Sequence, residues 1–218
     1  MNALAGGKSR RAAGRVFVAV AVVLLSVSVS VLLSVPAVNA QGSFTDTRDG
    51  KTYRTVKIGK QTWMAENLNY QTGNSVCYDN EESNCQKYGR LYDWNTAMKA
   101  CPAGWHLPSY LEWTALTDFV GGEKTAGTKL KSKTGWPYKA AATDDYGFSA
   151  LPGGSGGSGG SFGNAGSYGR WWSATEHDAY NAWYRYMNYY YEYVDRGSYD
   201  FKSGLFSLRC SQDSAAQR

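Results

Sequence analysis

The chain has 218 residues, a formal net charge of +5 and 43% hydrophobic residues. Lys8, Arg10, Arg11 and Arg15 lie in the segment 1–40, which contains no acid, so residues 41–218 carry +1 (+5 minus 4). The basic balance therefore belongs to the N-terminus, and the remaining chain lacks the positive charge expected of a nucleic-acid-binding domain. The part of the chain that follows Ala40 is long enough for one domain with a hydrophobic core.

The segment 1–40 has the three-part layout of a secretory signal peptide. A basic start precedes the uninterrupted apolar and serine run 16–35, and small residues surround the predicted cleavage point after Ala40. The run 16–35 is long enough to span a bilayer, so an uncleaved membrane anchor is the alternative. We therefore expect Sec-dependent export to the cell surface or medium, with membrane contact through this segment alone.

The domain is predicted to begin after a short polar lead-in at 44–49. Residues 52–64 are rich in β-branched and aromatic side chains and are interrupted by Gly59-Lys60, which predicts a β-hairpin. Residues 67–90 are rich in Asn, Gly, Ser and charge and are predicted to form a loop.

Two helices are predicted next. Asp93 suits the N-cap of a helix over 94–100, which Pro102 prevents from continuing. Ser109 and Glu112 have the spacing of a capping box, which marks the start of a second helix. The pair Gly121-Gly122 is predicted to end it.

The second half is predicted to contain short strands and loops. The stretch 151–169 contains nine glycines and is expected to be a long surface loop. It lacks the Gly-Lys-Ser/Thr ending and the following helix of a phosphate-binding loop. Strands are predicted at 170–176, twice within 182–194 around a tight turn near 188–191, and at 205–210. Helices followed by strands predict an α+β domain over 41–212, with a short disordered tail at 213–218.

Cys77, Cys85, Cys101 and Cys210 all follow the leader. An even cysteine count in an exported chain predicts two disulfides, and three pairings are open. We favour Cys77–Cys85, which closes a short loop, and Cys101–Cys210, which closes a long one. A zinc site is disfavoured because the chain has no Cys-x-x-Cys motif and contains only two histidines.

Several motifs occur in an order that resembles the Fibrobacter succinogenes major paralogous domain. They cover nearly all of 44–212: the run at 49–68, Gly-Arg-Leu-Tyr-Asp-Trp at 89–94, Cys-Pro-Ala-Gly-Trp-His-Leu-Pro-Ser at 101–109, Gly-Phe-Ser-Ala-Leu-Pro-Gly-Gly at 147–154, Trp-Trp-Ser-Ala-Thr-Glu at 171–176 and Leu-Phe-Ser-Leu-Arg-Cys at 205–210. The same order is similar to the wider C-type-lectin-like fold. That resemblance implies an exported bacterial domain with two short helices, small antiparallel sheets and a bridge from the first helix to the last strand.

The resemblance supplies no active site. Leu107-Pro108 and Glu112-Trp113 also resemble an element of sulfatase-modifying-factor domains, but all four cysteines here are expected in bridges, which leaves no thiol for that chemistry. His106 is expected to be structural, and His177 lies beside Glu176 and Asp178 without a convergent partner.

No metal or other cofactor is expected. The tripeptides that hold calcium in sugar-binding C-type lectins are absent. The acidic pairs Asp144–Asp145 and Glu176 with Asp178 are interpreted as turn caps or solvated charges, so calcium has no support.

The strongest functional indication is aromatic composition near the C-terminus. Tyrosine combines a large contact area with a polar tip and little conformational entropy, which is typical of recognition surfaces. Three consecutive tyrosines at 189–191 predict a strand with aromatic side chains on both faces. The predicted ligand-binding residues are Tyr184, Tyr186, Tyr189, Tyr190, Tyr191, Tyr193, Trp172 and Trp183.

The sequence thus predicts a non-catalytic recognition module that binds a glycan or a protein through this aromatic face. Two other classes stay open. One is an enzyme or accessory domain related to sulfatase-modifying factors, and the other is a structural component that assembles through the same face.

Overall fold

The mixed α+β class predicted from the sequence is confirmed. The computed structural model describes residues 41–137, 140–198 and 200–214, so the predicted signal peptide lies outside the described residues. No helix within these ranges is both long and apolar enough to cross a membrane. The helices are α1 (Glu82–Tyr88), α2 (Trp94–Ala100), α3 (Tyr110–Phe119), α4 (Glu123–Leu130) and the 3-10 turn η1 (Tyr78–Asn80).

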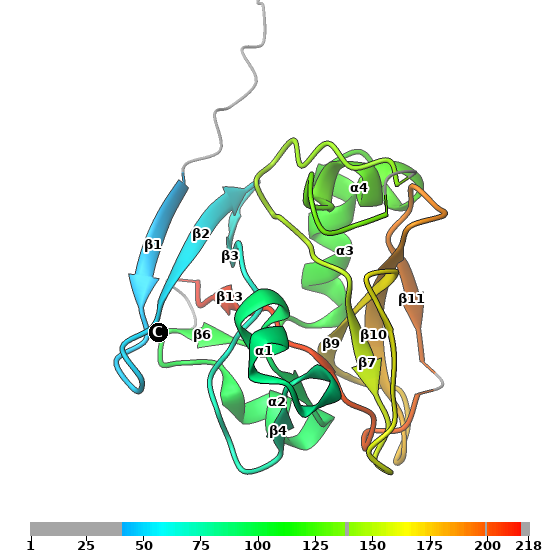
Figure 1. The fold of residues 1–218 in the computed structure, drawn as a ribbon. Helices are drawn as coiled ribbons and strands as arrows, with labels where there is room; N and C mark the ends of the chain where they lie inside the picture. Colours follow the sequence, from blue (N-terminus) through cyan, green and yellow to red (C-terminus); the bar gives the residue numbers. More distant parts are fainter. Residues whose placement is uncertain (1–40, 138–139, 199, 215–218) are drawn as a thin grey trace, which may run out of the picture. The chain divides into compact units, whose positions relative to one another are not determined.

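One sheet has five strands in the order β1-β2-β3-β13-β6. The predicted hairpin is present as β2 and β3. The expected polar lead-in at 44–49 includes the end of a further strand, β1, which pairs antiparallel with β2 (Figure 1). The strands are β1 (Gln41–Thr45), β2 (Thr52–Ile58), β3 (Gln61–Met64), β6 (Trp105–His106) and β13 (Ser211–Gln212).

The second sheet has eight strands, and its main path runs β11-β10-β9-β12-β5-β4. The long strands β9 and β10 are antiparallel, and β11 lies at the edge. Its strands are β4 (Ser75–Val76), β5 (Leu91–Tyr92), β7 (Gly153–Gly156), β8 (Phe162–Ala165), β9 (Tyr168–Glu176), β10 (Ala182–Asn188), β11 (Asp195–Gly197) and β12 (Phe206–Ser207).

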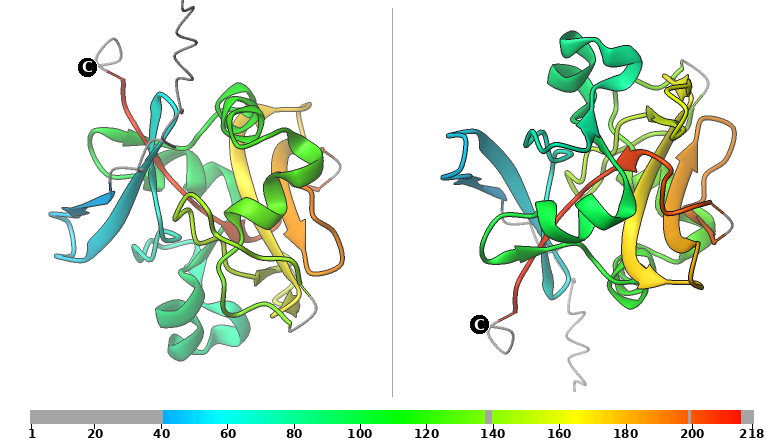
Figure 2. Two further views of the ribbon diagram at one scale, coloured as in Figure 1. Left: turned by 90° about the horizontal axis from the view of Figure 1, so that it is seen from above. Right: turned by 90° about the horizontal axis from the view of Figure 1, so that it is seen from below.

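Of the strand predicted at 205–210, only β12 is present, and a second short strand, β13, follows that range and lies in the other sheet. β12 pairs with β9 and β5 in the second sheet, and β13 pairs with β3 and β6 in the first. Figure 2 shows this C-terminal segment in red, passing from beside β9 toward the first sheet. The closing segment therefore joins the two sheets.

Two neighbouring tryptophans of β9 are buried on opposite faces of the second sheet. Successive strand residues point to opposite faces. Trp171 packs in a cluster with Trp113 of α3, whereas Trp172 packs in another with Phe206. Both tryptophans are fully buried, so β9 is covered on both sides.

The predicted starts of two helices are confirmed. The Asp93 side chain accepts a hydrogen bond from the Thr96 amide at the N-terminus of α2. Ser109 and Glu112 form the capping box of α3, in which each side chain bonds the backbone of the other. These contacts satisfy amides that have no partner within the helix.

Two helices were missed. α1 lies in the stretch predicted to be a loop, and it buries only Cys85 and Tyr88. The sequence predicted only strands and loops after Gly121-Gly122, whereas α4 follows this pair directly. Gly122 is the N-cap of α4, with a φ of 91° and no side-chain cap, so the usual start signal is absent.

The glycine-rich stretch is only partly a loop. Its residues form the hairpin β7–β8, and β7 also pairs parallel with β9. Gly154 has a φ of 70°, and a Cβ there would lie 2.7 Å from the Ala165 amide nitrogen. Close backbone approach therefore explains why this position is glycine.

Both favoured disulfides are present. Cys77 is joined to Cys85, and Cys101 at the end of α2 is joined to Cys210 between β12 and β13. The long bridge thus attaches α2 to the segment that joins the two sheets.

His106 lies on β6 and connects this strand to α3 and to the residue that follows β13. Its Nε2 lies 2.7 Å from Glu112 Oε1 on α3, and its Nδ1 lies 2.7 Å from Asp213 Oδ1 after β13. Asp213, which we assigned to the disordered tail, also donates its amide hydrogen to the Gly104 carbonyl. The hydrogen bond to Glu112, with a smaller contribution from Asp213, raises the pKa of His106 above its ordinary 6.5.

This network predicts a pH dependence of stability. A raised pKa means that the folded state holds its proton more tightly than the unfolded chain. The stabilisation is fully present below about pH 6.5 and is lost as the pH rises through the higher folded-state pKa. Urea unfolding from about pH 6 to 8 should show a falling free energy of unfolding for the wild type and a flatter profile for His106→Gln.

Asp213→Asn is the matched variant, because it keeps the imidazole and removes one of the two carboxylates. It should reduce the slope without abolishing it. Equal slopes in the wild type and His106→Gln would contradict this role for His106.

Candidate functional site

The three consecutive tyrosines lie in the loop between β10 and β11. We call residues 189–194 the tyrosine loop. Our expectation of a strand with aromatics on both faces was wrong, because the strand ends at Asn188. Tyr190 and Tyr191 are 68% and 51% exposed, so the loop presents aromatic surface to solvent.

The start of the tyrosine loop is fixed by a buried side chain. Asn188 is 3% exposed, and its Oδ1 accepts hydrogen bonds from the amides of Tyr190 and Tyr191 at 2.9 and 3.0 Å. An asparagine that bonds the backbone two and three residues on is a common turn device. The Tyr189 amide also donates to the Ser167 carbonyl. The tight turn predicted near this position therefore has a defined backbone.

The rest of the loop is docked on α4. The Thr128 amide donates to the Glu192 carbonyl, and the Val194 amide donates to the Glu123 carbonyl, each at 3.0 Å. Val194 is fully buried. Gly127 allows this approach, since a Cβ there would lie 2.4 Å from the Tyr193 carbonyl oxygen.

A buried lysine also holds the loop. Lys131 follows α4, and its Nζ donates to the Tyr191 carbonyl at 2.6 Å and lies 5.3 Å from the centre of the Trp136 ring. Burial lowers the pKa of Lys131 to about 8, and nearby Glu192 opposes that effect. The amine donates this hydrogen bond whether charged or neutral, so the anchor persists in both forms.

The ring arrangement forms a continuous aromatic cluster. The Tyr189 and Tyr190 ring centres are 3.8 Å apart, and those of Tyr190 and Tyr191 are 6.3 Å apart. Tyr191 stacks on Tyr193 at 4.7 Å with an interplanar angle of 14°. Such ring pairs stabilise one another, so their side chains are partly ordered before any ligand arrives.

A groove adjoins this cluster. It has a volume of about 520 Å³ and is lined by Gly121, Gly122, Glu123, Lys124, Tyr193 and Asp195. One wall is the start of α4 and the other is the end of the tyrosine loop with β11. The site therefore combines an aromatic surface with carboxylates, an amine and glycine backbone.

The charged groups at the groove are held by neighbours. Asp195 Oδ2 accepts a hydrogen bond from the Tyr186 hydroxyl at 2.6 Å. Burial, and then this bond, raise the pKa of Tyr186. Glu123 Oε2 lies 3.8 Å from Arg196 Nη1. This surface ion pair leaves carboxylate oxygens free to accept further hydrogen bonds.

The other predicted contact residues are divided between two faces of β10. Tyr184 and Tyr186 lie on one face, with ring centres 6.1 Å apart. Tyr184 is half-buried against Trp172 and Phe206, and Trp183 packs against Tyr110 on the other side.

Trp172 lies in the core. It is fully buried, and its indole N–H donates to the Tyr92 carbonyl. Its side chain is therefore not on the surface that we predicted to bind a ligand. The error arose because an aromatic residue in a central strand was taken to be exposed.

The groove residues were missed from the sequence. Glu123 and Lys124 belong to the helix that was not predicted, so nothing placed them near the tyrosines. The available signal was the acidic residue immediately after Gly121-Gly122, which is typical of a first helical turn.

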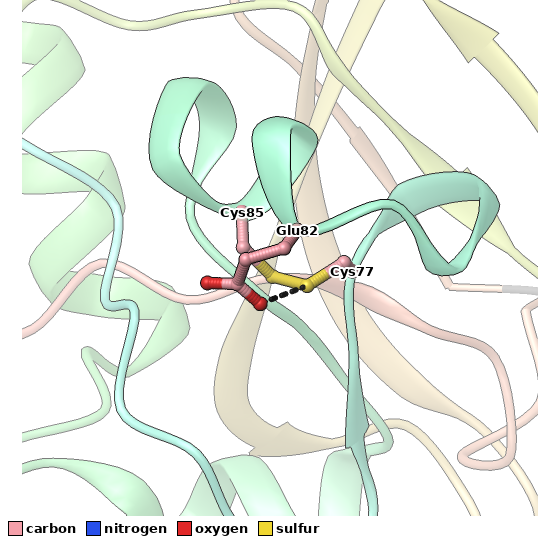
Figure 3. A group of neighbouring side chains, drawn as sticks. All are labelled: Cys77, Glu82 and Cys85. Atoms are coloured by element: carbon pink, nitrogen blue, oxygen red, sulfur yellow. Dashed lines mark hydrogen bonds between the residues drawn. A yellow bond between two sulfur atoms is a disulfide. The ribbon is translucent and has the colours of Figure 1, made fainter.

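Within the described residues, one group of three side chains has metal-like spacing: Cys77, Glu82 and Cys85 (Figure 3). The two sulfurs form a disulfide, so no thiolate is available as a ligand. The 3.4 Å approach of Glu82 Oε2 to Cys77 Sγ is a contact, because a disulfide sulfur has no hydrogen to donate. Glu82 also lies 3.7 Å from the Arg90 guanidinium. We assign the group a structural role.

Two of the four acidic residues that we interpreted as turn caps or solvated charges, Asp144 and Asp178, form cap contacts. Asp144 accepts hydrogen bonds from the Ser149 amide and hydroxyl. Asp178 accepts from the Tyr180 and Asn181 amides, and the Asn181 side chain makes the largest contribution to the lowered pKa of Asp178.

These features define a disulfide-bonded α+β domain with an exposed, backbone-anchored aromatic loop. The model of the Fibrobacter succinogenes major domain matches residues 56–212, and the chain belongs to this family. Comparison with curated proteins and with solved structures gave no match.

Proposed function

We propose that this chain is a non-catalytic recognition module that binds a glycan through the tyrosine loop and the adjoining groove. The observation that carries the proposal is the pair of exposed tyrosines, Tyr190 and Tyr191, on a loop whose backbone is fixed on both sides.

The chemistry of the site matches that of a sugar. A pyranose ring has an apolar C–H face that stacks on an aromatic ring, and a rim of hydroxyls that donate and accept hydrogen bonds. Tyr190 and Tyr191 offer the exposed rings, whereas Glu123 and Asp195 offer acceptors and Lys124 a donor at the groove.

The anchored backbone supports a binding role over a merely exposed loop. Ordering a flexible loop on association costs free energy that subtracts from affinity. Here hydrogen bonds between the loop backbone and Thr128, Glu123 and Lys131 order it beforehand. The ligand then has to order side chains alone.

The proposal includes export and a C-type-lectin-like arrangement. Two disulfides are typical of proteins from oxidising compartments, which supports a secreted or cell-surface location. The order of motifs and the bridge from α2 to the closing segment support the C-type-lectin-like assignment.

The absence of a free thiol supports a non-catalytic role over the thiol chemistry of sulfatase-modifying factors. All four cysteines of the chain are paired in disulfides. We also propose that the module works without calcium or another cofactor.

The test is a glycan array followed by titration of the best ligand against tyrosine variants. Tyr191→Ala removes half of a stacked pair and should weaken binding about tenfold or more, which is about 1.4 kcal/mol or more. Tyr190→Ala should weaken binding in the same direction because it removes the more exposed ring.

Tyr180→Ala is the matched control. Tyr180 is 74% exposed and lies in the connection between β9 and β10, outside the tyrosine loop and groove. It should bind as the wild type does. An array without any signal, or loop variants that bind normally, would defeat the proposal. Self-association that disappears in Tyr190→Ala would instead favour an assembly role.

A further inference from the structure

We propose a second ligand site, built by the β7–β8 hairpin and the segment 200–206 over Arg170, that binds a neutral monosaccharide ring. This site shares no lining residue with the groove beside the tyrosine loop. This site can therefore be tested independently of the glycan site proposed above.

The site is a pocket of about 370 Å³. That volume lies in the range of about 300–1,000 Å³ typical of small-molecule sites. Serine hydroxyls and aromatic rings line it together: the hairpin contributes Ser155, Ser158, Ser161 and Phe162, and the opposite wall contributes Phe201 and Ser203.

The two walls are joined at one end. Gly156 and Leu205 exchange backbone hydrogen bonds at 2.9 and 2.8 Å. The Phe162 ring packs against Tyr78, with ring centres 5.3 Å apart. The hairpin wall therefore has a fixed position relative to the segment that faces it.

Phe201 is the aromatic platform. Its side chain is 65% exposed, which is unusual for phenylalanine, yet its backbone is anchored. It forms a β-bridge with Asn181, and its carbonyl accepts a hydrogen bond from the Gly204 amide at 2.7 Å. The next residue, Lys202, donates its amide hydrogen to the Tyr180 carbonyl. An exposed ring on a fixed backbone suits stacking against a ligand.

Arg170 and Asp200 supply the polar part. Arg170 Nη1 lies 3.3 Å from Asp200 Oδ2, and the Arg170 guanidinium packs 5.5 Å from the centre of the Phe206 ring. Arg170 Nε is buried and has no hydrogen-bond partner among the described residues. The pair thus offers both a donor and an acceptor to a ligand.

This combination selects a neutral, hydroxylated ring. The Asp200 carboxylate disfavours an anion, and Arg170 disfavours a cation. The serines disfavour a purely apolar ligand, since their hydroxyls would lose water without replacement. A pyranose offers hydroxyls to the charged pair and the serines, and an apolar face to Phe201.

The experiment is an NMR titration of the ¹⁵N-labelled protein with the methyl glycosides of glucose, galactose, mannose and xylose. At least one should shift the amides of 155–163 and of Phe201, with a Kd in about the millimolar range for a single ring. Phe201→Ala should weaken that binding about tenfold or more.

Two further variants separate the sites. Gly163→Leu adds bulk at a lining position where a Cβ meets no atom within 4 Å, so it should obstruct binding while the protein stays folded. Tyr191→Ala should leave these shifts unchanged. If no methyl glycoside shifts the hairpin, if Phe201→Ala and Gly163→Leu bind normally, or if glucuronate binds in preference to the neutral sugars, the inference is overturned.

Discussion

Replacing both Cys101 and Cys210 with alanine is expected to lower the free energy of unfolding by about 4–5 kcal/mol. The two cysteines are 109 residues apart, and a bridge that closes a long loop removes much conformational entropy from the unfolded chain. Because stabilities of about 5–15 kcal/mol are typical of single domains, this loss is a large share of the total. Urea unfolding followed by tryptophan fluorescence measures it.

The Cys77→Ala, Cys85→Ala pair is the matched control. Its cysteines are eight residues apart, so the same model gives about 2–3 kcal/mol. The long bridge should therefore cost about 2 kcal/mol more than the short one. Equal losses, or a larger loss from the short bridge, would show that native-state packing around Cys85, which is 1% exposed, outweighs loop closure.

The position of the long bridge explains a structural consequence of this loss. Cys210 lies between β12 of one sheet and β13 of the other, and its carbonyl accepts a hydrogen bond from the Met64 amide. Without the bridge, the segment that joins the two sheets keeps its short strands as anchors. We therefore expect hydrogen exchange to rise first in β12 and β13.

The elements that the sequence predicted well have local chemical signals. Asp93 and Ser109 cap helices through side-chain bonds to amides three residues away, so a short pattern suffices. The hairpin β2–β3 likewise depends on a turn and on its own strands.

The elements that the sequence did not predict depend on distant neighbours. α4 has Gly122 as its N-cap, without a side-chain cap, and contains Gly127, which lowers its intrinsic helix propensity. Its stability comes from burial of Ala126 and Leu130 and from the docked tyrosine loop. Strand β7 is a run of glycine and serine whose strand geometry is set by pairing with β8 and β9.

The candidate site shows the same division. Aromatic composition located the tyrosine loop, since the exposed residues Tyr190 and Tyr191 were among those predicted. Composition could not separate them from Trp172, because burial depends on what covers each face of the sheet. The groove residues Glu123 and Lys124 could not be placed without α4.

Gly127→Ala is expected to displace the tyrosine loop and to weaken glycan binding about tenfold or more. A new Cβ would lie 2.4 Å from the Tyr193 carbonyl oxygen and 2.7 Å from that of Glu192. Both are backbone atoms, so they cannot turn away as a side chain could. Overpacking of this kind costs about 1–3 kcal/mol.

The sign of the stability change makes this variant informative. Within a helix, alanine is favoured over glycine by about 0.8–1.0 kcal/mol, so propensity alone predicts that Gly127→Ala stabilises the protein. Steric contact with the docked loop predicts the opposite. Urea unfolding therefore decides whether the loop lies against α4 as the structure has it.

Gly73→Ala is the matched control, because a Cβ at that position meets no atom within 4 Å. It should leave stability and binding close to those of the wild type. Hydrogen exchange at the Thr128 and Val194 amides gives a readout that needs no ligand, since both amides bond across this contact. Faster exchange at both in Gly127→Ala, with unchanged exchange in Gly73→Ala, is the expected result. A Gly127→Ala protein that is more stable than the wild type, with both amides exchanging at the wild-type rate, would mean that the loop does not lie against Gly127 and that this contact does not hold its tyrosines in advance of binding.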